Sequence, residues 1–358
     1  MKRKNFFLLA AMATALIGLP SCSSDETEIS EKIENPAELK ITASMTPLLD
    51  VSTRAAYDLQ GTSLIDFTKV GIYVWYTGNT AAKTSAPVYN GYENVSVTGQ
   101  TGTGPWDLTP SQTLGFPIDN HDVDVYLYAP YKSSPTQTDM CMEHTVASDQ
   151  SLTEGYVASD FLYGKATAKY SGSVSPEIDK TARVTMYHAM SKLIFKVVNS
   201  GVDPANMTDI TLQNFFTKTT INMPVAIGAT LSCGSGSTTY NVDAATVKSN
   251  IKVWGTSGTG AVTTSDVVSN GVAVIVPPQT TDSDAKVSVS TNNGSSTFTA
   301  VANFNGKTLN PGKVYTYNLK LIGTGVTISL VSITDWDSSE SPTGTDADLD
   351  FSSWSSGS

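Results

Sequence analysis

Cys22 is the residue whose surroundings most clearly indicate a chemical modification. Three basic residues among the first four precede an apolar run from Phe6 to Leu19, which is too short to span a bilayer comfortably. The run ends at this thiol, and polar sequence begins at once. We therefore expect residues 1–21 to be a lipoprotein signal peptide and Cys22 to carry lipid. An ordinary secretory signal with an incidental cysteine is the alternative.

The stretch Ser23–Glu28 is short and acidic. It resembles the export tag by which lipoproteins of Bacteroidetes-type bacteria reach the outer face of the outer membrane, although a solvated linker would look similar. Acyl chains on one cysteine hold a protein to a membrane because each buried CH₂ contributes roughly 0.8 kcal/mol. We expect a lipid-anchored precursor on the cell surface.

The three histidines, His121, His144 and His188, lack the spacing of a metal site. Neither H-x-x-x-H nor H-E-x-x-H occurs in the sequence, and no G-x-S-x-G elbow or P-loop is present. We expect a structural role for His188, which precedes a strand-like segment. The sequence predicts no metal, no cofactor and no enzymatic activity.

Acidic residues gather in two places without the pattern of a calcium-binding loop. The clusters are Asp119, Asp122 and Asp124, and, near the end of the chain, Asp346, Asp348 and Asp350. Neither has the D-x-[DN]-x-[DN]-G pattern with a distal glutamate that an EF-hand requires. A solvated acidic edge that discourages unwanted strand pairing is our interpretation, and a weak calcium site is the alternative.

The cysteine count and the net charge bear on disulfide bonds and on the kind of partner. Besides Cys22, the chain has only Cys141 and Cys233, for which we expect two free buried thiols, with a disulfide between them as the alternative. The net charge is −11, and it becomes more negative when the signal peptide, which carries three positive charges, is removed. Nucleic acid is excluded as a partner because no basic patch is present to neutralise phosphates.

Apolar residues recur with a period near two through most of the chain, which predicts an all-β protein. β-Branched and aromatic residues alternate with polar ones, as a sheet with one buried face requires. The segment 292–296, Asn-Asn-Gly-Ser-Ser, predicts a hairpin connection. The clearest predicted strands are 70–76, 123–129, 192–198, 272–276, 286–290 and 315–321.

Many short strands without crossover helices indicate antiparallel sandwiches rather than a parallel sheet. The Gly- and Ser-containing stretch 171–176 suggests a domain boundary shortly before a strand that begins near Ala182. We expect the following organisation: signal peptide 1–21, linker and N-terminal strand 22–54, N-terminal β-sandwich domain 55–180, C-terminal β-sandwich domain 181–338, and flexible tail 339–358.

Several phrases in the chain, taken together, resemble the fimbrillin family of Bacteroides and Porphyromonas, the Mfa-like fimbrial subunits and their anchor lipoproteins. Each phrase alone is a weak signal, but their order and spacing behind a lipoprotein signal make the match specific. The phrases are Thr53-Arg54-Ala55, Val125–Tyr131, Ser159–Ala166, Tyr187–Phe195, Ile275–Thr280, Leu309–Tyr317 and Ile333–Trp336.

The resemblance implies two tandem transthyretin-like antiparallel β-sandwich domains. It also implies that an arginine-specific protease cuts the subunit, that the N-terminal strand leaves, and that a neighbouring subunit's terminal strand fills the vacated groove. Arg54 matches the cleavage position, so Ala55 would begin the mature chain. An anchor subunit would keep its lipid and escape cleavage.

Two segments have the alternation that such an exchange needs. Leu39, Ile41, Ala43 and Met45 alternate with polar residues just before Arg54, which predicts a removable strand that would leave an unpaired edge and an apolar trench. Near the other end, the candidate donor strand alternates in the same way, with apolar residues at Val326, Ile328 and Leu330.

We therefore expect a structural subunit of a cell-surface fimbria that serves adhesion, with other fimbrial subunits, an arginine-specific protease and the outer membrane as its partners. A surface-exposed glycan-binding lipoprotein is the alternative, in which Trp75, Trp106 and Trp254 would stack on sugar rings. Burial of these side chains would argue against that alternative. The sequence leaves open whether the subunit is stalk, tip or anchor.

Overall fold

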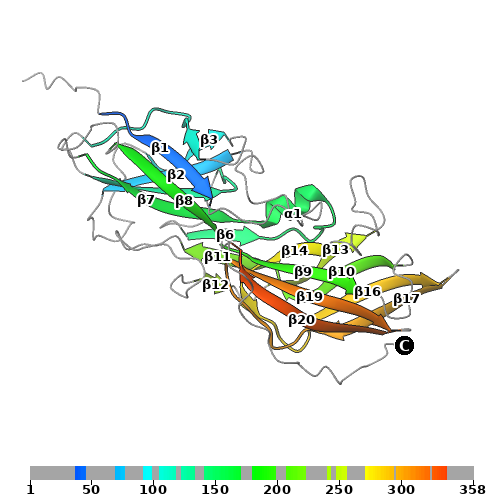
Figure 1. The fold of residues 1–358 in the computed structure, drawn as a ribbon. Coiled ribbons are helices and arrows are strands. Elements are labelled where there is room, and N and C mark those ends of the chain that lie inside the picture. The colour runs from blue at the N-terminus through cyan, green and yellow to red at the C-terminus, as the bar shows by residue number, and fades with distance from the viewer. Residues whose placement is uncertain are drawn as a thin grey trace, which may run out of the picture. The chain divides into compact units, whose positions relative to one another are not determined.

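Strands form nearly all of the regular structure that the computed structural model describes (Figure 1). A single short helix, α1 (Thr153–Ser159), occurs among the described residues, so the predicted all-β class is confirmed. Its seven residues are too few to show a helical period in the sequence. The described residues are 37–45, 69–76, 92–98, 105–117, 122–133, 141–170, 180–198, 207–222, 240–242, 247–255, 271–293, 296–322 and 325–336.

The first half of the chain builds a seven-stranded sheet, here called the N-terminal sheet. Its two outer strands approach each other, since the backbone N–H of Ser111, just after the last strand of the sheet, donates to Ser96 of the first at 2.9 Å. In order across the sheet, the strands are β3 (Val95–Thr98), β2 (Lys69–Tyr76), β5 (Val123–Ala129), β7 (Leu162–Ala168), β8 (Thr181–His188), β1 (Lys40–Met45) and β4 (Trp106–Leu108).

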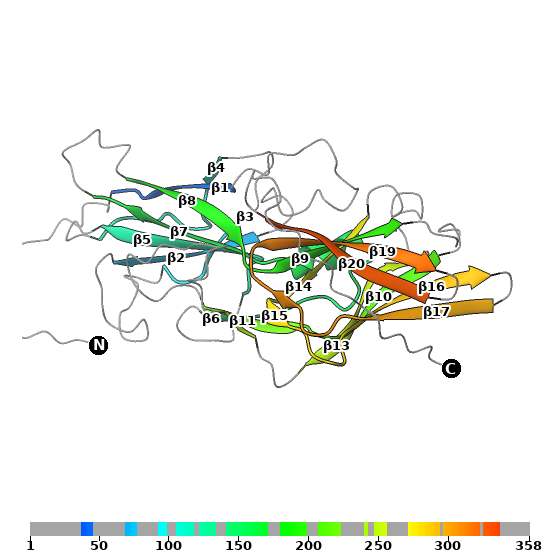
Figure 2. The same ribbon diagram turned by 60° about the horizontal axis from the view of Figure 1, so that its bottom comes forward.

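The second half builds two four-stranded sheets that pack face to face, here called the C-terminal sandwich (Figure 2). One sheet has the order β13 (Lys248–Gly255), β10 (Met207–Phe216), β16 (Lys286–Asn293) and β17 (Ser296–Asn303). The other has the order β14 (Val272–Val276), β9 (Ser191–Val198), β19 (Lys313–Ile322) and β20 (Gly325–Asp335). All six strands predicted most clearly from the sequence are present, as is the hairpin, which joins β16 to β17.

A chain of four aromatic rings joins the two sheets of this sandwich. Phe215 of β10 lies 5.4 Å from Phe304, Phe304 lies 5.0 Å from Tyr317 of β19, and Tyr317 lies 5.9 Å from Phe195 of β9, measured between ring centroids. Aromatic pairs at such distances add stability beyond the area that they bury. This chain of rings forms part of the buried core between the two sheets.

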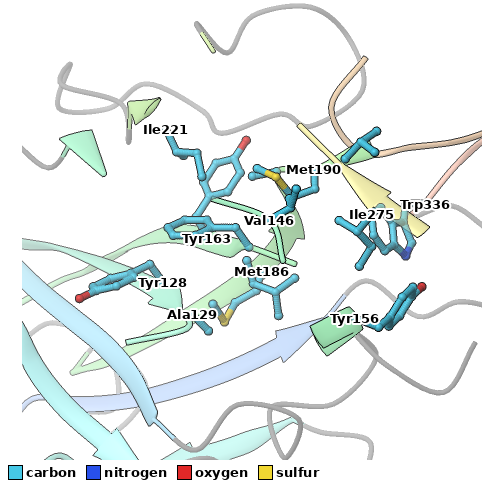
Figure 3. Close-up of a cluster of buried hydrophobic side chains, with 14 of the residues drawn as sticks. Tyr128, Ala129, Val146, Tyr156, Tyr163, Met186, Met190, Ile221, Ile275 and Trp336 are labelled. Carbon is cyan, nitrogen blue, oxygen red and sulfur yellow. The ribbon is translucent and has the colours of Figure 1, made fainter. Parts of the chain in front are cut away.

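Two small sheets complete the described strands. One has the order β12 (Tyr240–Val242), β11 (Lys218–Asn222) and β6 (Cys141–Thr145), and the other joins β15 (Gln279–Thr280) to β18 (Thr308–Leu309). Buried apolar side chains of the N-terminal sheet and of the C-terminal sandwich belong to one continuous cluster. Figure 3 shows part of it, including Met186 of β8, Ile275 of β14 and Trp336.

The boundary that we placed between residues 180 and 181 does not coincide with a change of sheet. β8 pairs with β7 and with β1, so the N-terminal sheet continues to His188. The segment 171–179 therefore connects two strands of one sheet rather than two sheets. The division of the chain into two transthyretin-like domains stays a prediction.

Two strand pairs are parallel, whereas we expected antiparallel sheets. β1 runs parallel to β8, and β9 runs parallel to β19. Parallel neighbours need a connection of a dozen residues or more, and more than 100 residues separate the two members of each pair. No local turn therefore forces these strands to run in opposite directions.

A buried side chain closes one edge of the C-terminal sandwich. The amide of Gln150 donates to the carbonyl of Ile275 at 2.7 Å and accepts from the N–H of the same residue at 2.8 Å, so it takes the place of a strand beside β14. The backbone around Gln150 also bonds to both backbone groups of Lys252 in the edge strand β13, each at 2.8 Å. These backbone N–H and C=O groups could otherwise pair with a strand of another molecule, and they are thereby satisfied.

A second buried glutamine works in the same way. Gln279 accepts from the N–H of Phe216 and donates to its carbonyl, both at 3.0 Å. The side-chain amide carries one acceptor and two donors, and its second donor bonds to the carbonyl of Pro277 at 3.0 Å. Each glutamine thus imitates the backbone of a missing strand.

We expect Gln150→Leu to lower the free energy of unfolding by about 2–4 kcal/mol, because it leaves the buried N–H and C=O of Ile275 without their partner. Urea denaturation of the purified protein measures the loss. The matched control is Gln112→Leu, which changes an exposed glutamine and should stay within about 0.5 kcal/mol of the wild type. Equal losses in the two variants would contradict the role of Gln150.

His144 of β6 is buried in its neutral form. Burial lowers the pKa of His144 from 6.5 to about 4. Its Nε2 lies 2.9 Å from the carbonyl oxygen of Ser159 and so donates to it, and its ring meets the ring of Phe161 edge-on at 5.3 Å. Protonation would place a charge in this buried site, so the folded state binds the proton far less readily than the unfolded chain does.

His144 should make the protein sensitive to acid. Its contribution to stability is fully present above pH 6.5 and is lost as the pH falls toward 4, by about 3 kcal/mol over that window. His144→Gln keeps a donor but cannot titrate. Denaturation midpoints measured from pH 7 to pH 4 should therefore fall less steeply in this variant, and identical slopes would rule the explanation out.

Candidate strand-exchange site

β1 lies inside the N-terminal sheet, between two other strands. One of them, β8, is seen beside it in Figure 1. On one side it pairs in parallel with β8, from Lys40 opposite Thr181 to Met45 opposite Met186. On the other side it pairs in antiparallel fashion with β4. The backbone of Ile41, Thr42 and Ala43 is thus paired along both edges.

The residues just before β1 extend this double pairing. The N–H of Leu39 donates to the carbonyl of Leu114 at 2.9 Å, and the N–H of Phe116 donates to the carbonyl of Ala37 at 2.9 Å. On the opposite side, the N–H of Lys40 donates to the carbonyl of Lys180 at 3.1 Å. The described segment is thus paired on both sides at its centre, with residues 114–116 before it and with β8 up to Met45.

One face of β1 points into the core. Leu39, Ile41 and Ala43 are only 4%, 2% and 0% exposed, while Lys40 between them is exposed. The backbone of Met45 is part of β1, but its side chain is outside the part that the structure describes. The alternation seen in the sequence therefore matches the burial of the first three inward positions.

The surroundings of Ala43 restrict the size of a side chain at that position. Ala43 is paired with Val184 of β8 on one side and with Trp106 of β4 on the other, and both of these side chains are buried. Residues directly opposite each other in a sheet have their Cβ atoms about 4.5–5.5 Å apart. A small residue fits between these two larger ones.

Removal of β1 would have a different effect from the one that we expected. We expected a single unpaired edge, but β1 has a neighbour on each side. Its departure would expose two rows of backbone groups, one on β8 and one on β4 with residues 114–116, above an apolar floor. An incoming strand could bond to both rows.

The sequence predicts only one of the two strands that border β1. The alternation in Ala182–Met186 predicts a strand, and β8 is that strand. β4 has only three residues and contains Asp107, so it is too short for a periodic pattern to stand out. Its pairing with β1, about 60 residues earlier in the chain, left no local signal.

The candidate donor segment lies in β20. β20 pairs with β19 at ten positions, with Val326 and Ile328 buried and Leu330 half-buried. It is the last strand of its sheet, and among the described residues no further strand is paired with its outer edge. Donation of this segment to another subunit would require β20 to separate from β19.

The end of β20 is fixed by a stack of rings against β8. Trp336 lies parallel to the ring of His188, with 3.9 Å between the centroids. Nδ1 of His188 lies 2.8 Å from the Oδ2 atom of Asp160, and the amino group of Lys192 lies 5.4 Å from the centre of the Trp336 ring. His188 is thus enclosed by a stacking partner and a hydrogen-bond partner. The stack connects the C-terminal sandwich to the N-terminal sheet.

The residues predicted for lipidation and cleavage, Cys22, Arg54 and Ala55, lie outside the described residues. The side chains of Cys141 and Cys233 lie outside them as well. No helix in the described part of the chain is long and apolar enough to cross a membrane.

The described acidic residues of the first cluster are occupied by other protein groups. Asp124 lies 3.0 Å from the amino group of Lys165 and accepts from the hydroxyl of Thr167 at 2.5 Å, and Asp122 accepts from the N–H of Tyr170 at 2.8 Å. In the described ranges, no group of three or more His, Cys, Asp or Glu residues is arranged to hold a metal ion. Asp119, His121 and the acidic cluster 346–350 are not among the residues described.

The three tryptophans considered for sugar stacking do not form an exposed platform. Trp75, Trp106 and Trp254 are 5%, 4% and 0% exposed. Trp106 instead forms part of the wall beside β1. Their burial argues against the glycan-binding alternative.

The chain is similar to known proteins in both sequence and structure. The profile of the fimbrillin-like family matches residues 53–336. Comparison with functionally curated proteins gives no match.

The chain shares its fold with solved structures, among them two candidate cell adhesion proteins. A candidate cell adhesion protein from Bacteroides uniformis superposes with a TM-score of 0.54 at 18% identity, covering 84% of this chain and 99% of that one. A candidate cell adhesion protein from Bacteroides ovatus superposes with a TM-score of 0.53 at 17% identity, covering 84% of this chain and 98% of that one. Since the family profile spans most of the sequence, from the step at Arg54 to Trp336, the chain belongs to the fimbrillin-like family.

Proposed function

We propose that this protein is a structural subunit of a cell-surface fimbria that is assembled by strand exchange and serves adhesion. The position of β1 carries the proposal, because a strand near the N-terminus fills a groove between β8 and β4. Membership of the fimbrillin-like family and the fold shared with candidate adhesion proteins support it. The role is structural and needs no catalytic residue or cofactor.

The proposed trigger is cleavage after Arg54 by an arginine-specific protease. Arg54 follows β1 by nine residues, so the cut separates β1 from the rest of the chain and leaves Ala55 as the new N-terminus. β1 is then held by hydrogen bonds and by the burial of Leu39, Ile41 and Ala43 alone. A leucine or isoleucine side chain contributes about 1.5–3 kcal/mol when fully buried, so a strand with similar side chains can replace it.

The proposed donor is the segment with Val326, Ile328 and Leu330 from a neighbouring subunit. It has the same alternation of apolar and polar residues as β1 and contains no charge between Gly325 and Thr334. Main-chain hydrogen bonds would supply much of the affinity, and the apolar side chains would set the register.

Delivery to the surface is proposed to depend on lipid at Cys22 and on the acidic stretch that follows it. A subunit that is cut after Arg54 loses this lipid together with β1. A subunit that escapes the cut keeps residues 22–54 and remains anchored in the outer membrane. Stalk and anchor roles therefore differ by one peptide bond.

We expect treatment of the full chain with an arginine-specific protease to produce an N-terminus at Ala55 and oligomers that resist heating in detergent. N-terminal sequencing and gel electrophoresis measure both. Arg54→Lys is the matched control, because it keeps the positive charge but removes the preferred residue. Identical oligomers from this variant, or an intact 22–54 segment in every molecule taken from cells, would refute a cleaved stalk role.

A synthetic peptide of residues 37–45 should occupy the vacated groove and block oligomer formation. The same peptide with Ile41→Asp should bind on the order of 100-fold more weakly, since it places a carboxylate at a buried apolar position. Fluorescence anisotropy with labelled peptide measures the affinities. If the two peptides compete equally well, β1 does not define the groove. A peptide of residues 325–335 tests the donor segment in the same assay.

A further inference from the structure

Arg183 is, besides Arg54, the arginine that an arginine-specific protease would meet once the expected signal peptide has been removed. The sequence contains three arginines, Arg3, Arg54 and Arg183, and the first belongs to the expected signal peptide. Arg183 lies in the middle of β8, and its side chain is exposed. A protease could therefore reach the side chain, and only the state of the backbone limits cleavage.

β1 supplies the strand pairing at Arg183. Arg183 is opposite Thr42 in the parallel ladder between β1 and β8. On the other side of β8, the ladder with β7 covers only Met186, Tyr187 and His188, so within the described structure it does not extend to residues 181–185. When β1 leaves, this stretch of β8 loses its ladder with β1.

Proteolysis requires such an opening. A chain segment held in the interior of a sheet is protected, and its rate of cleavage follows the population of the open form when opening is fast. An extended segment with free backbone groups can instead be bound as an additional strand by another protein. Loss of β1 leaves Arg183 in an extended segment that carries the residue preferred by the same protease.

We propose that Arg183 is a conditional second cleavage site, hidden by β1 in the precursor and by the incoming strand in the assembled subunit. Water adds across the Arg183–Val184 peptide bond, which leaves a carboxylate on Arg183 and an amino group on Val184. The biological role of this site rests on the proposed strand exchange. Cleavage after Arg183 would eliminate subunits whose groove stays empty.

Cleavage at this position would destroy the subunit. Val184 and Met186 are 1% and 0% exposed and form part of the core. In the sheet, β8 lies between β7 and the position of β1. A cut in the middle of β8 removes the chain continuity that holds these side chains in register. The cut at Arg54 matures the subunit, and the cut at Arg183 discards it.

The test displaces β1 without cutting it. In a chain with Arg54→Lys, the added substitution Ile41→Asp should raise the rate of cleavage after Arg183 at least about tenfold, because it weakens the hold of the core on β1. The matched control is Lys40→Asp, which places the same side chain at an exposed position of β1. Mass spectrometry of the fragments after timed digestion identifies the cut, and Arg183→Lys should abolish it.

Equal cleavage rates in the Ile41→Asp and Lys40→Asp chains would overturn the proposal. If Ile41→Asp unfolds the whole chain, as circular dichroism would reveal, the wild-type chain cut at Arg54 decides the matter. An excess of the 37–45 peptide should then slow cleavage at Arg183, and an unchanged rate would reject the site. Failure to cut at Arg54 would count against the proposed function alone, because the Ile41→Asp arm does not depend on it.

Discussion

Every strand brings a row of backbone N–H and C=O groups that must find partners, and this requirement governs the whole structure. Most strands satisfy it with their neighbours in the sheet. Where a neighbour is missing, Gln150 and Gln279 imitate one with their side-chain amides. In the N-terminal sheet, the missing neighbour of β8 is supplied by β1, a strand from the far end of the sequence. A side chain is a permanent solution, whereas the separate strand is the element that the proposed function exchanges.

The two solutions differ in how the partner of an unpaired backbone is attached to the rest of the chain. The glutamines belong to the continuous chain and cannot be removed without a mutation. β1 is joined to its neighbours by hydrogen bonds and by the burial of Leu39, Ile41 and Ala43, and no neighbour in its sheet is its neighbour in sequence. Under the proposed strand exchange, the exchangeable element would therefore be confined to one groove.

The sequence predicted the strands better than their arrangement. The strand-forming residues of β2, β5, β9, β14, β16 and β19 identified these strands, and alternation also indicated a strand before Arg54, where burial of one face imposes a period of two. In β5 and β14, by contrast, every residue is buried. Nothing local could reveal that β1 runs parallel to β8 or that the three-residue β4 closes its other side. The bonds of Gln150 to Ile275 were equally invisible, since 125 residues separate them. Pairing between distant segments is decided by the assembled core, which a periodic pattern does not describe.

The double pairing of β1 also determines how its position responds to force. Hydrogen bonds between strands run across the strand direction, so a pull along the axis of a strand in this groove loads the bonds on both sides together. A pull at right angles would instead open them one after another. A strand that links two subunits through this groove is therefore loaded in shear, the geometry in which such a joint is strongest.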